Sequence, residues 1–242
     1  FLQTWDYFKQ RNLRKESFQH YKVRWREEPN PTLNFPYSSW NDLQQTVTPS
    51  EYLKGRFCNP KDYRHRFIYY RDAKEKLKAS IFGLEQAMDR LEMSRSTSPD
   101  ESVTLVITEG EIDCISVYQS TYWLPHKKYA SISIANGVHD NFQQIDLQFC
   151  DYFDKIILSF DFDRAGRLAT KTFAERLLTV HLDHAKIYVV TGPQPGRKYL
   201  KDANDYLALS EDNLLDILCD SNSSYVRPYE LVRNTLFDYL PE

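Results

Sequence analysis

The sequence predicts an α/β protein in which a mostly parallel sheet, flanked by helices, follows a smaller α+β part that is basic. After residue 103, short apolar runs alternate with segments of helical spacing, as in strand–helix units of a parallel sheet. Before residue 96, basic and aromatic residues interleave instead. The length of 242 residues suffices for two such parts. We expect a basic subdomain over 1–95, an α/β domain over 103–210 and a helical tail or linker over 211–242.

The first elements are predicted from spacing. Leu2, Trp5 and Phe8 fall three apart, which indicates a short amphipathic helix. A second short helix follows, with Ser17 as its expected N-cap. Several prolines then mark an irregular connection, beyond which residues 33–37 are extended.

The later elements follow in order. A helix is predicted from Ile81 to about Met93, and the polar segment from Ser94 to Ser102 is predicted to be a loop. Strands are expected at 103–108, 131–134, 155–160 and 186–190, and further helical stretches at 214–218 and 229–240.

Charge is unevenly distributed along the chain. The whole chain has 31 Lys and Arg and 34 Asp and Glu. Residues 1–80 hold 16 of the basic and 9 of the acidic residues, a net charge of +7. The remaining residues hold 15 basic and 25 acidic ones, a net charge of −10. A basic front part and an acidic back part suit a polyanion partner and bound cations, respectively. An uneven solvated surface explains the charge alone equally well.

Composition excludes several classes of protein. No apolar run approaches transmembrane length, so we expect no membrane partner. The four cysteines are dispersed without a CxxC pair, which argues against a zinc ribbon or a disulfide framework and predicts reduced thiols in an intracellular protein. No Ser/His/Asp or Cys/His arrangement has a recognisable spacing. The chain opens on Phe1 rather than Met, so an excised domain or a processed product is expected.

The stretch from Leu158 to Gly166 carries the sharpest chemical signal. Asp161 and Asp163 come where an apolar run ends and a helical pattern begins. In an extended chain residues i and i+2 point the same way, so both carboxylates would face one pocket, and a hard cation such as Mg²⁺ would offset their repulsion. The plainer interpretation is a helix-capping Asp with a second, solvated Asp beside it.

Two further acidic clusters favour the metal-site interpretation over helix capping. Glu109 and Asp113 follow an earlier predicted strand, and Asp202 and Asp205 follow a later one. Carboxyl ends of parallel strands share one edge, where ligands bind in open α/β sheets. Carboxylates that converge there would repel one another without cations. Two Mg²⁺ or Mn²⁺ ions would satisfy them and support in-line attack at phosphorus.

Basic residues interleave with aromatic ones before the α/β part. The cations are Lys54, Arg56, Lys61, Arg64 and Arg66. Such a mixture suits phosphate contacts beside base-stacking rings. A solvated β-ribbon with ordinary cross-strand aromatics is the alternative.

The acidic clusters resemble motifs of a known family. Residues 109–113, EGEID, resemble the EGxxD element of the Toprim domain, and residues 161–166, DFDRAG, resemble its DxDxxG element. Residues 201–205, KDAND, are similar to the version found in primases of the phage and organellar primase-helicase type. Residues 53–56, LKGR, resemble the basic template-strand motif of the primase RNA-polymerase region. The Toprim catalytic domain would then span 103–210.

This resemblance implies template-directed synthesis of short RNA primers from nucleoside triphosphates on single-stranded DNA. It assigns catalysis to Glu109, Asp161 and Asp163, and metal binding to Glu109, Asp113, Asp161, Asp163, Asp202 and Asp205. It assigns template and nucleotide contacts to Lys54, Arg56, Lys61, Arg64, Arg66, Asn136, Gly137 and Lys201.

Two modules that often accompany this region are missing from the sequence. It has neither a cysteine-rich zinc module nor the P-loop of a helicase, so no zinc is expected in this chain. Either the chain is a fragment of a larger primase-helicase, or it works alone. A replicative helicase, fused or separate, is an expected partner.

Other functions of the acidic pocket stay open. A Toprim nuclease would share it, but the basic N-terminal part is of primase type. A topoisomerase would need an attacking tyrosine in a further domain. The third alternative is a non-catalytic DNA-binding module of a primase-helicase. The presence of all the acidic motifs argues against it.

Overall fold

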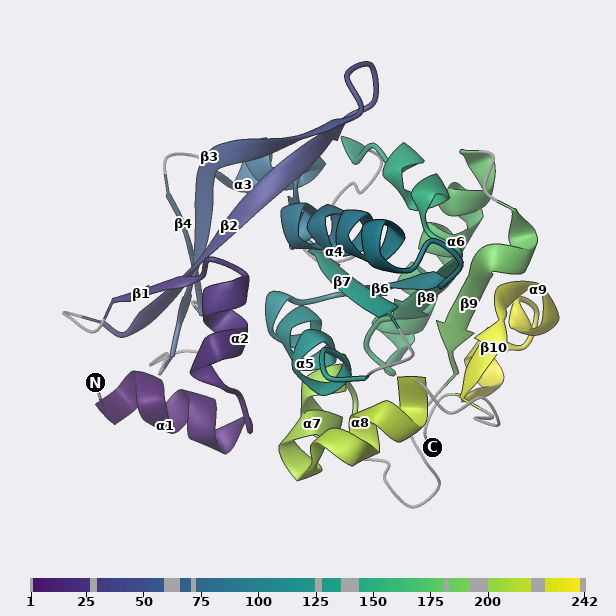
Figure 1. Ribbon diagram of the computed structural model, residues 1–242. Coiled ribbons are helices and arrows are strands. Elements are labelled where there is room, and N and C mark those ends of the chain that lie inside the picture. Colours follow the sequence, from purple (N-terminus) through teal and green to yellow (C-terminus); the bar gives the residue numbers. More distant parts are fainter. Residues whose placement is uncertain are drawn as a thin grey trace.

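The structure is a computed structural model that describes residues 2–26, 30–58, 66–70, 73–124, 128–135, 144–180, 183–191, 200–218 and 225–239. One mixed sheet runs through this part of the molecule (Figure 1). Its strand order is β10-β9-β8-β6-β7-β5-β2-β3-β4, and β1 pairs with β2 outside this path. The strands are β1 (Arg24–Arg26), β2 (Thr32–Asn41), β3 (Thr46–Phe57), β4 (Phe67–Tyr69), β5 (Ile81–Phe82), β6 (Val103–Thr108), β7 (Lys128–Ile134), β8 (Lys155–Ser159), β9 (Ile187–Val190) and β10 (Val226–Pro228).

Helices connect and cover these strands. The α-helices are α1 (Leu2–Gln10), α2 (Lys15–His20), α3 (Ala73–Lys76), α4 (Leu84–Thr97), α5 (Glu111–Thr121), α6 (Arg164–Thr179), α7 (Ala203–Leu209), α8 (Glu211–Leu218) and α9 (Tyr229–Val232). Short 3₁₀ turns are η2 (Leu77–Ala79), η4 (Gln148–Tyr152), η5 (His184–Lys186) and η6 (Leu236–Tyr239). Among the described residues, no helix has both the length and the apolar character needed to cross a bilayer.

The C-terminal part confirms the predicted α/β architecture. Strands β7, β6, β8 and β9 run parallel, and β6 is buried along its whole length. Alternation along β6 places Leu105 and Ile107 in one core with α4, α6 and α9, and Val106 in another with α5, α7 and α8. A strand covered on both faces reads as a continuous apolar run, which is why these strands could be predicted.

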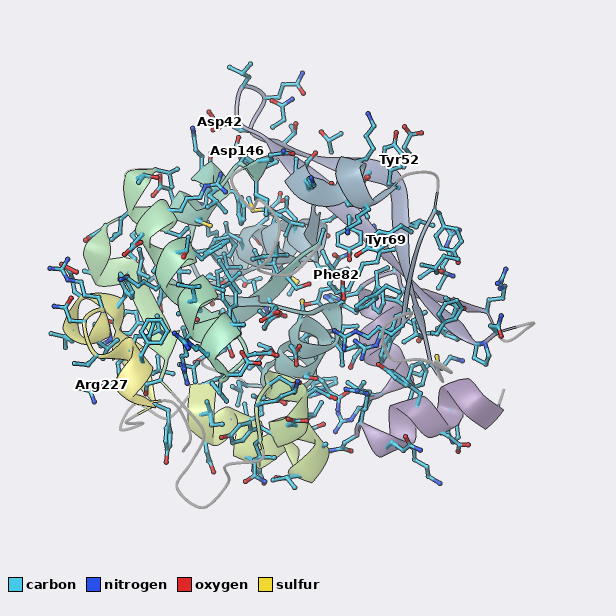
Figure 2. The ribbon with its side chains drawn as sticks, turned by 180° about the vertical axis from the view of Figure 1, so that it is seen from behind. Asp42, Tyr52, Tyr69, Phe82, Asp146 and Arg227 are labelled. Atoms are coloured by element: carbon cyan, nitrogen blue, oxygen red, sulfur yellow. The ribbon has the colours of Figure 1, made fainter. Side chains whose placement is uncertain are left out.

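The N-terminal part is built on the long β2–β3 hairpin, which extends from the lower left to the top of Figure 1. Strand β5 joins it to the parallel strands, because Ile81 pairs with Ser38 of β2 and with Ile134 of β7. Phe82 is fully buried at this junction. Figure 2 shows Phe82 in the middle of the molecule, between Tyr69 of β4 and the side that carries Arg227. The two parts therefore share one sheet, while the division at residues 1–95, 103–210 and 211–242 stays a prediction.

Several predicted elements differ from the structure. Residues 81–82 form a strand rather than the start of a helix, and Gly83 then turns the chain with a φ of +81°. Helix α4 continues to Thr97, into the segment predicted as a loop. The N-cap of α2 is Arg14, because Ser17 is buried within the helix and its hydroxyl donates to Gln119. Strand β10, at the edge of the sheet, was missed because it has only three residues.

Candidate active site

Three carboxylates meet at the carboxyl edge of the parallel strands. Asp113 lies in the first turn of α5 after β6, Asp161 lies just after β8, and Asp202 is the N-cap of α7 after β9. One oxygen from each lies within 4.8 Å of the others. We call these residues the acidic triad. Strands β9, β8 and β6 are neighbours in the sheet, so the chain turns after each of them at the same place.

Burial and mutual repulsion disfavour the state in which all three carboxylates of the triad are ionised. Burial, and after it the nearby charges of Glu109 and Asp202, raise the pKa of Asp161 to about 8. The pKa of Asp113 lies well above its ordinary value, first through burial and then through Asp202 and Asp161. Burial also raises the pKa of Asp202, with Asp205 as the next cause. Converging carboxylate oxygens are the donors that Mg²⁺ and Mn²⁺ prefer, so the triad fits a divalent cation.

One hydrogen bond and two glycines shape the surroundings of the triad. The backbone N–H of Asn204 donates to Oδ1 of Asp113 at 3.0 Å. A Cβ at Gly110 would lie 2.9 Å from Oδ2 of the same carboxylate. Gly110 has extended backbone angles, so what this position requires is space beside Asp113 rather than a tight turn. A Cβ at Gly166 would lie 2.1 Å from the carbonyl oxygen of Asp161, so the first turn of α6 packs closely against the backbone that follows β8.

Asp163 lies outside the acidic triad. Asp163 is exposed, and its Oδ1 accepts a 2.9 Å hydrogen bond from the N–H of Gly166 as the N-cap of α6. Asp205 is close to the triad but outside it. Its N–H donates to Oδ1 of Asp202 at 2.8 Å, and its Oδ2 accepts from the N–H of Lys201 at 2.9 Å.

A cavity of about 380 Å³ opens in front of the triad. Its acidic wall carries the triad with Glu109, Glu111 and Asp205. Its basic wall comes mostly from the N-terminal part and consists of Arg11, Lys54, Arg56, Arg66, Lys74 and Lys201. Of the predicted contact residues, Lys54, Arg56, Arg66 and Lys201 therefore line the cavity, whereas Lys61, Arg64, Asn136 and Gly137 lie outside the described residues.

The basic residues differ in what they contact. The guanidinium of Arg56 lies over the rings of Tyr7 and Phe67, with centroid distances of 5.9 and 5.6 Å. The Nζ of Lys201 lies 3.9 Å from Oδ2 of Asp161. Lys54 is buried, and its Nζ lies 2.7 Å from Oε1 of Glu111.

Some residues of this site were given no role in it from the sequence. Arg11 of the first connection lines the cavity and donates to Oδ1 of Asn204 at 2.6 Å. The side chain of Asn204 also donates to Ser116 at 3.0 Å. Glu111 is buried two residues before Asp113. Their roles depend on contacts between distant segments, which spacing within one segment cannot reveal.

Comparison with known proteins identifies relatives of this arrangement. A family model described as Toprim-like matches residues 106–207. Over 113 residues the chain is 32% identical to a DNA helicase/primase of Enterobacteria phage T3, a match that covers 46% of this chain and 17% of that protein.

Solved structures share the fold. The primase fragment of the bacteriophage T7 primase-helicase has a TM-score of 0.50 at 21% identity, over 86% of this chain and 71% of that one. The zinc-binding and RNA-polymerase domains of the Aquifex aeolicus primase give a TM-score of 0.56 at 16% identity, over 93% of this chain and 50% of that one. A T7 gp4 primase domain, solved with an RNA/DNA hybrid and dTTP, gives 0.50 at 22% identity, over 84% and 85%.

Proposed function

Because residues 106–207 form a Toprim-like domain and the chain has the fold of primase catalytic regions, we propose that it is the catalytic core of a DNA primase. Such a core would synthesise short RNA primers on single-stranded DNA from nucleoside triphosphates. The observation that carries the proposal is the cavity lined both by the half-buried acidic triad and by several cations. Metal-assisted phosphoryl transfer needs both walls, one for the ions and one for the phosphates.

The acidic wall would hold divalent cations, Mg²⁺ or Mn²⁺. Asp113, Asp161 and Asp202 offer converging oxygens, and Glu109 lines the same wall. Bound ions would supply Lewis-acid stabilisation of the attacking and leaving oxygens at phosphorus. The proposal also includes a second ion and a general-base role for Glu109. It further includes metal contacts from Asp163 and Asp205.

The basic wall would position the nucleic acid and the incoming nucleotide. Arg56 and Arg66 offer guanidinium groups with the fork geometry that suits phosphate oxygens. Lys201 beside Asp161 would meet the triphosphate close to the ions. Lys61, Arg64, Asn136 and Gly137 stay predicted contacts. A replicative helicase, which the name of the phage T3 relative includes, is the proposed partner.

Primer synthesis on a mixed-sequence single-stranded DNA template tests this function. The reaction contains labelled ribonucleotides with Mg²⁺ or Mn²⁺, and the wild type runs beside the double variant Asp161→Ala/Asp163→Ala. Short metal-dependent products that disappear in the variant support the proposal. Metal-dependent degradation of the template without products would indicate a Toprim nuclease instead. Template binding with neither activity would indicate a non-catalytic binding module.

Salt dependence gives an independent test of the basic wall. Binding through phosphate contacts releases counterions, so the affinity for single-stranded DNA should fall steeply as salt rises. A dissociation constant that does not change between low and moderate salt would contradict a phosphate-binding wall. Arg95→Met is a suitable control for substitutions in the basic wall. Arg95 lies on α4, does not line this cavity and donates to the carbonyl of Tyr152.

A further inference from the structure

A buried ion pair joins the N-terminal part to the start of the Toprim-like domain. Lys54 lies on β3 and Glu111 is the first residue of α5. Their relative exposures are 4% and 1%, and Nζ lies 2.7 Å from Oε1. Two charges this deeply buried are retained only when they satisfy each other, since either one alone would be costly.

Further contacts surround both charges. Nζ of Lys54 also donates to the carbonyl oxygen of Ala135 at 2.8 Å, just beyond β7. The ring centroid of Phe67 lies 4.2 Å from the same nitrogen. On the other side, the hydroxyl of Tyr37 on β2 donates to Oε1 of Glu111. An ammonium with two oxygen partners and a ring beside it has little capacity left for a phosphate.

The ion pair lies at the first turn of α5, beside the acidic wall of the cavity. Gly110 is the N-cap of α5 and offers no side-chain cap. Glu111 is one side chain that ties the first turn of this helix to the N-terminal part. It lies two residues after Glu109 and two before Asp113, a member of the acidic triad.

We propose that Lys54 is a positioning residue that, through Glu111, holds the first turn of α5 and hence Asp113 in the metal-binding geometry. We call this contact the Lys54–Glu111 clamp. The proposal rests on the metal site of the proposed primase, and it gives Lys54 a different task from the phosphate contact expected from the sequence. Arg56, two residues on, retains the phosphate-binding task, because its guanidinium contacts rings rather than a carboxylate.

A double-mutant cycle tests the clamp. The variants are Lys54→Met, Glu111→Gln and the two together, with Arg56→Met as the matched phosphate-contact control. Three quantities are measured in the same protein: Mn²⁺ affinity by electron paramagnetic resonance, kcat and KM for primer synthesis, and the salt dependence of single-stranded DNA binding.

We expect Lys54→Met to weaken Mn²⁺ binding and to lower kcat by about tenfold or more, because a small displacement of a catalytic group has a large effect on rate. The salt dependence of DNA binding should stay that of the wild type. The double variant should recover at least about threefold of the lost Mn²⁺ affinity, because it leaves no unpaired buried charge and Gln can still accept from Tyr37. Arg56→Met should raise KM and reduce the salt slope by about 0.7.

The opposite pattern would overturn the clamp. If Lys54→Met reduces the salt slope as Arg56→Met does, and Glu111→Gln restores nothing, Lys54 is a phosphate contact. Should Lys54→Met fail to fold, the double variant decides, since a folded double variant with Mn²⁺ affinity near the wild-type value supports the clamp and one without metal affinity contradicts it. A wild type that makes no primers would defeat the proposed function only, because the coupling in Mn²⁺ affinity is measured without synthesis.

Discussion

The backbone N–H of Asn204 donates a 3.0 Å hydrogen bond to Oδ1 of Asp113, across 91 positions of sequence. The side chain of Asn204 accepts from Arg11 at 2.6 Å and donates to the carbonyl of Arg11 at 3.2 Å and to Ser116 at 3.0 Å. Asn204 is only 2% exposed. One residue therefore links the end of the first helical segment, α5 and α7 to a member of the acidic triad.

Asn204→Ala should lower both stability and metal affinity. The substitution removes three side-chain hydrogen bonds of Asn204, two with Arg11 and one with Ser116, which should cost about 2–3 kcal/mol of unfolding free energy. Urea denaturation measures that loss, and Mn²⁺ titration measures the effect on Asp113. Asn30→Ala, at an exposed position, is the control. Wild-type stability in Asn204→Ala would show that these hydrogen bonds contribute nothing net.

Asp161→Asn should separate stability from activity. Asparagine keeps the shape of the side chain but removes a half-buried charge that Glu109 and Asp202 repel. Without metal at pH 8, the variant should be more stable than the wild type by about 1–2 kcal/mol, while Mg²⁺-dependent synthesis should fall at least about 100-fold. The control is Asp216→Asn, an exposed acid on α8. A variant that is less stable than the wild type without metal would show that the charge at Asp161 does not destabilise the metal-free protein.

The position of the acidic site could be predicted from the sequence because it depends on topology alone. Apolar runs mark the buried strands β6 and β8, and parallel strands bring their carboxyl ends to one edge. Asp113, Asp161 and Asp202 each follow such a strand, so no knowledge of tertiary contacts was needed to bring them together.

The contacts between the two parts of the chain could not be predicted in that way. Arg11 and Asn204 lie 193 positions apart, and Lys54 and Glu111 lie 57 apart. No periodicity within either segment encodes which distant residue it will meet. A basic residue beside aromatic ones indicates a phosphate contact as readily as a buried partner, and only the contact of Lys54 with Glu111 distinguishes the two.

The two aspartates of the DxD motif show a second limit. Spacing in an extended chain suggests that Asp161 and Asp163 point the same way. The chain turns into α6 at Asp163, however, and the first N–H groups of a helix need acceptors. One oxygen of Asp163 therefore caps the helix, while Asp161 joins the triad.

Serine and alanine at position 163 should divide the two tasks of that residue. Serine is a good N-cap, so Asp163→Ser should keep wild-type stability, whereas Asp163→Ala should lose about 1 kcal/mol. If the carboxylate also faces the ions as proposed, both variants should lose Mg²⁺-dependent synthesis by about tenfold or more. Thermal unfolding and primer synthesis are measured on the same samples. Full activity in Asp163→Ser would restrict Asp163 to capping.

The titration of Asp161 should make the metal-free protein less stable as pH rises. Burial, with Glu109 and Asp202 as further causes, raises the pKa of this carboxyl to about 8, whereas in the unfolded chain it is about 4. Between these values the native protein holds a proton that the unfolded chain has released. The free energy of unfolding should therefore decrease as pH rises toward and through the folded pKa.

The window from about pH 6.5 to 8.5 brackets the folded pKa of Asp161 and is where the effect should be measured. Burial lowers the pKa of His20 to about 4, so this histidine stabilises the fold with rising pH only below its unfolded pKa of about 6.5. Within the window we expect the metal-free protein to lose about 1–2 kcal/mol, measured by urea denaturation in a chelator. Mg²⁺ should oppose the loss most strongly at the alkaline end, because it binds the ionised triad. Asp161→Asn should flatten the profile, and a wild-type stability that rises across the window would contradict an elevated pKa at Asp161.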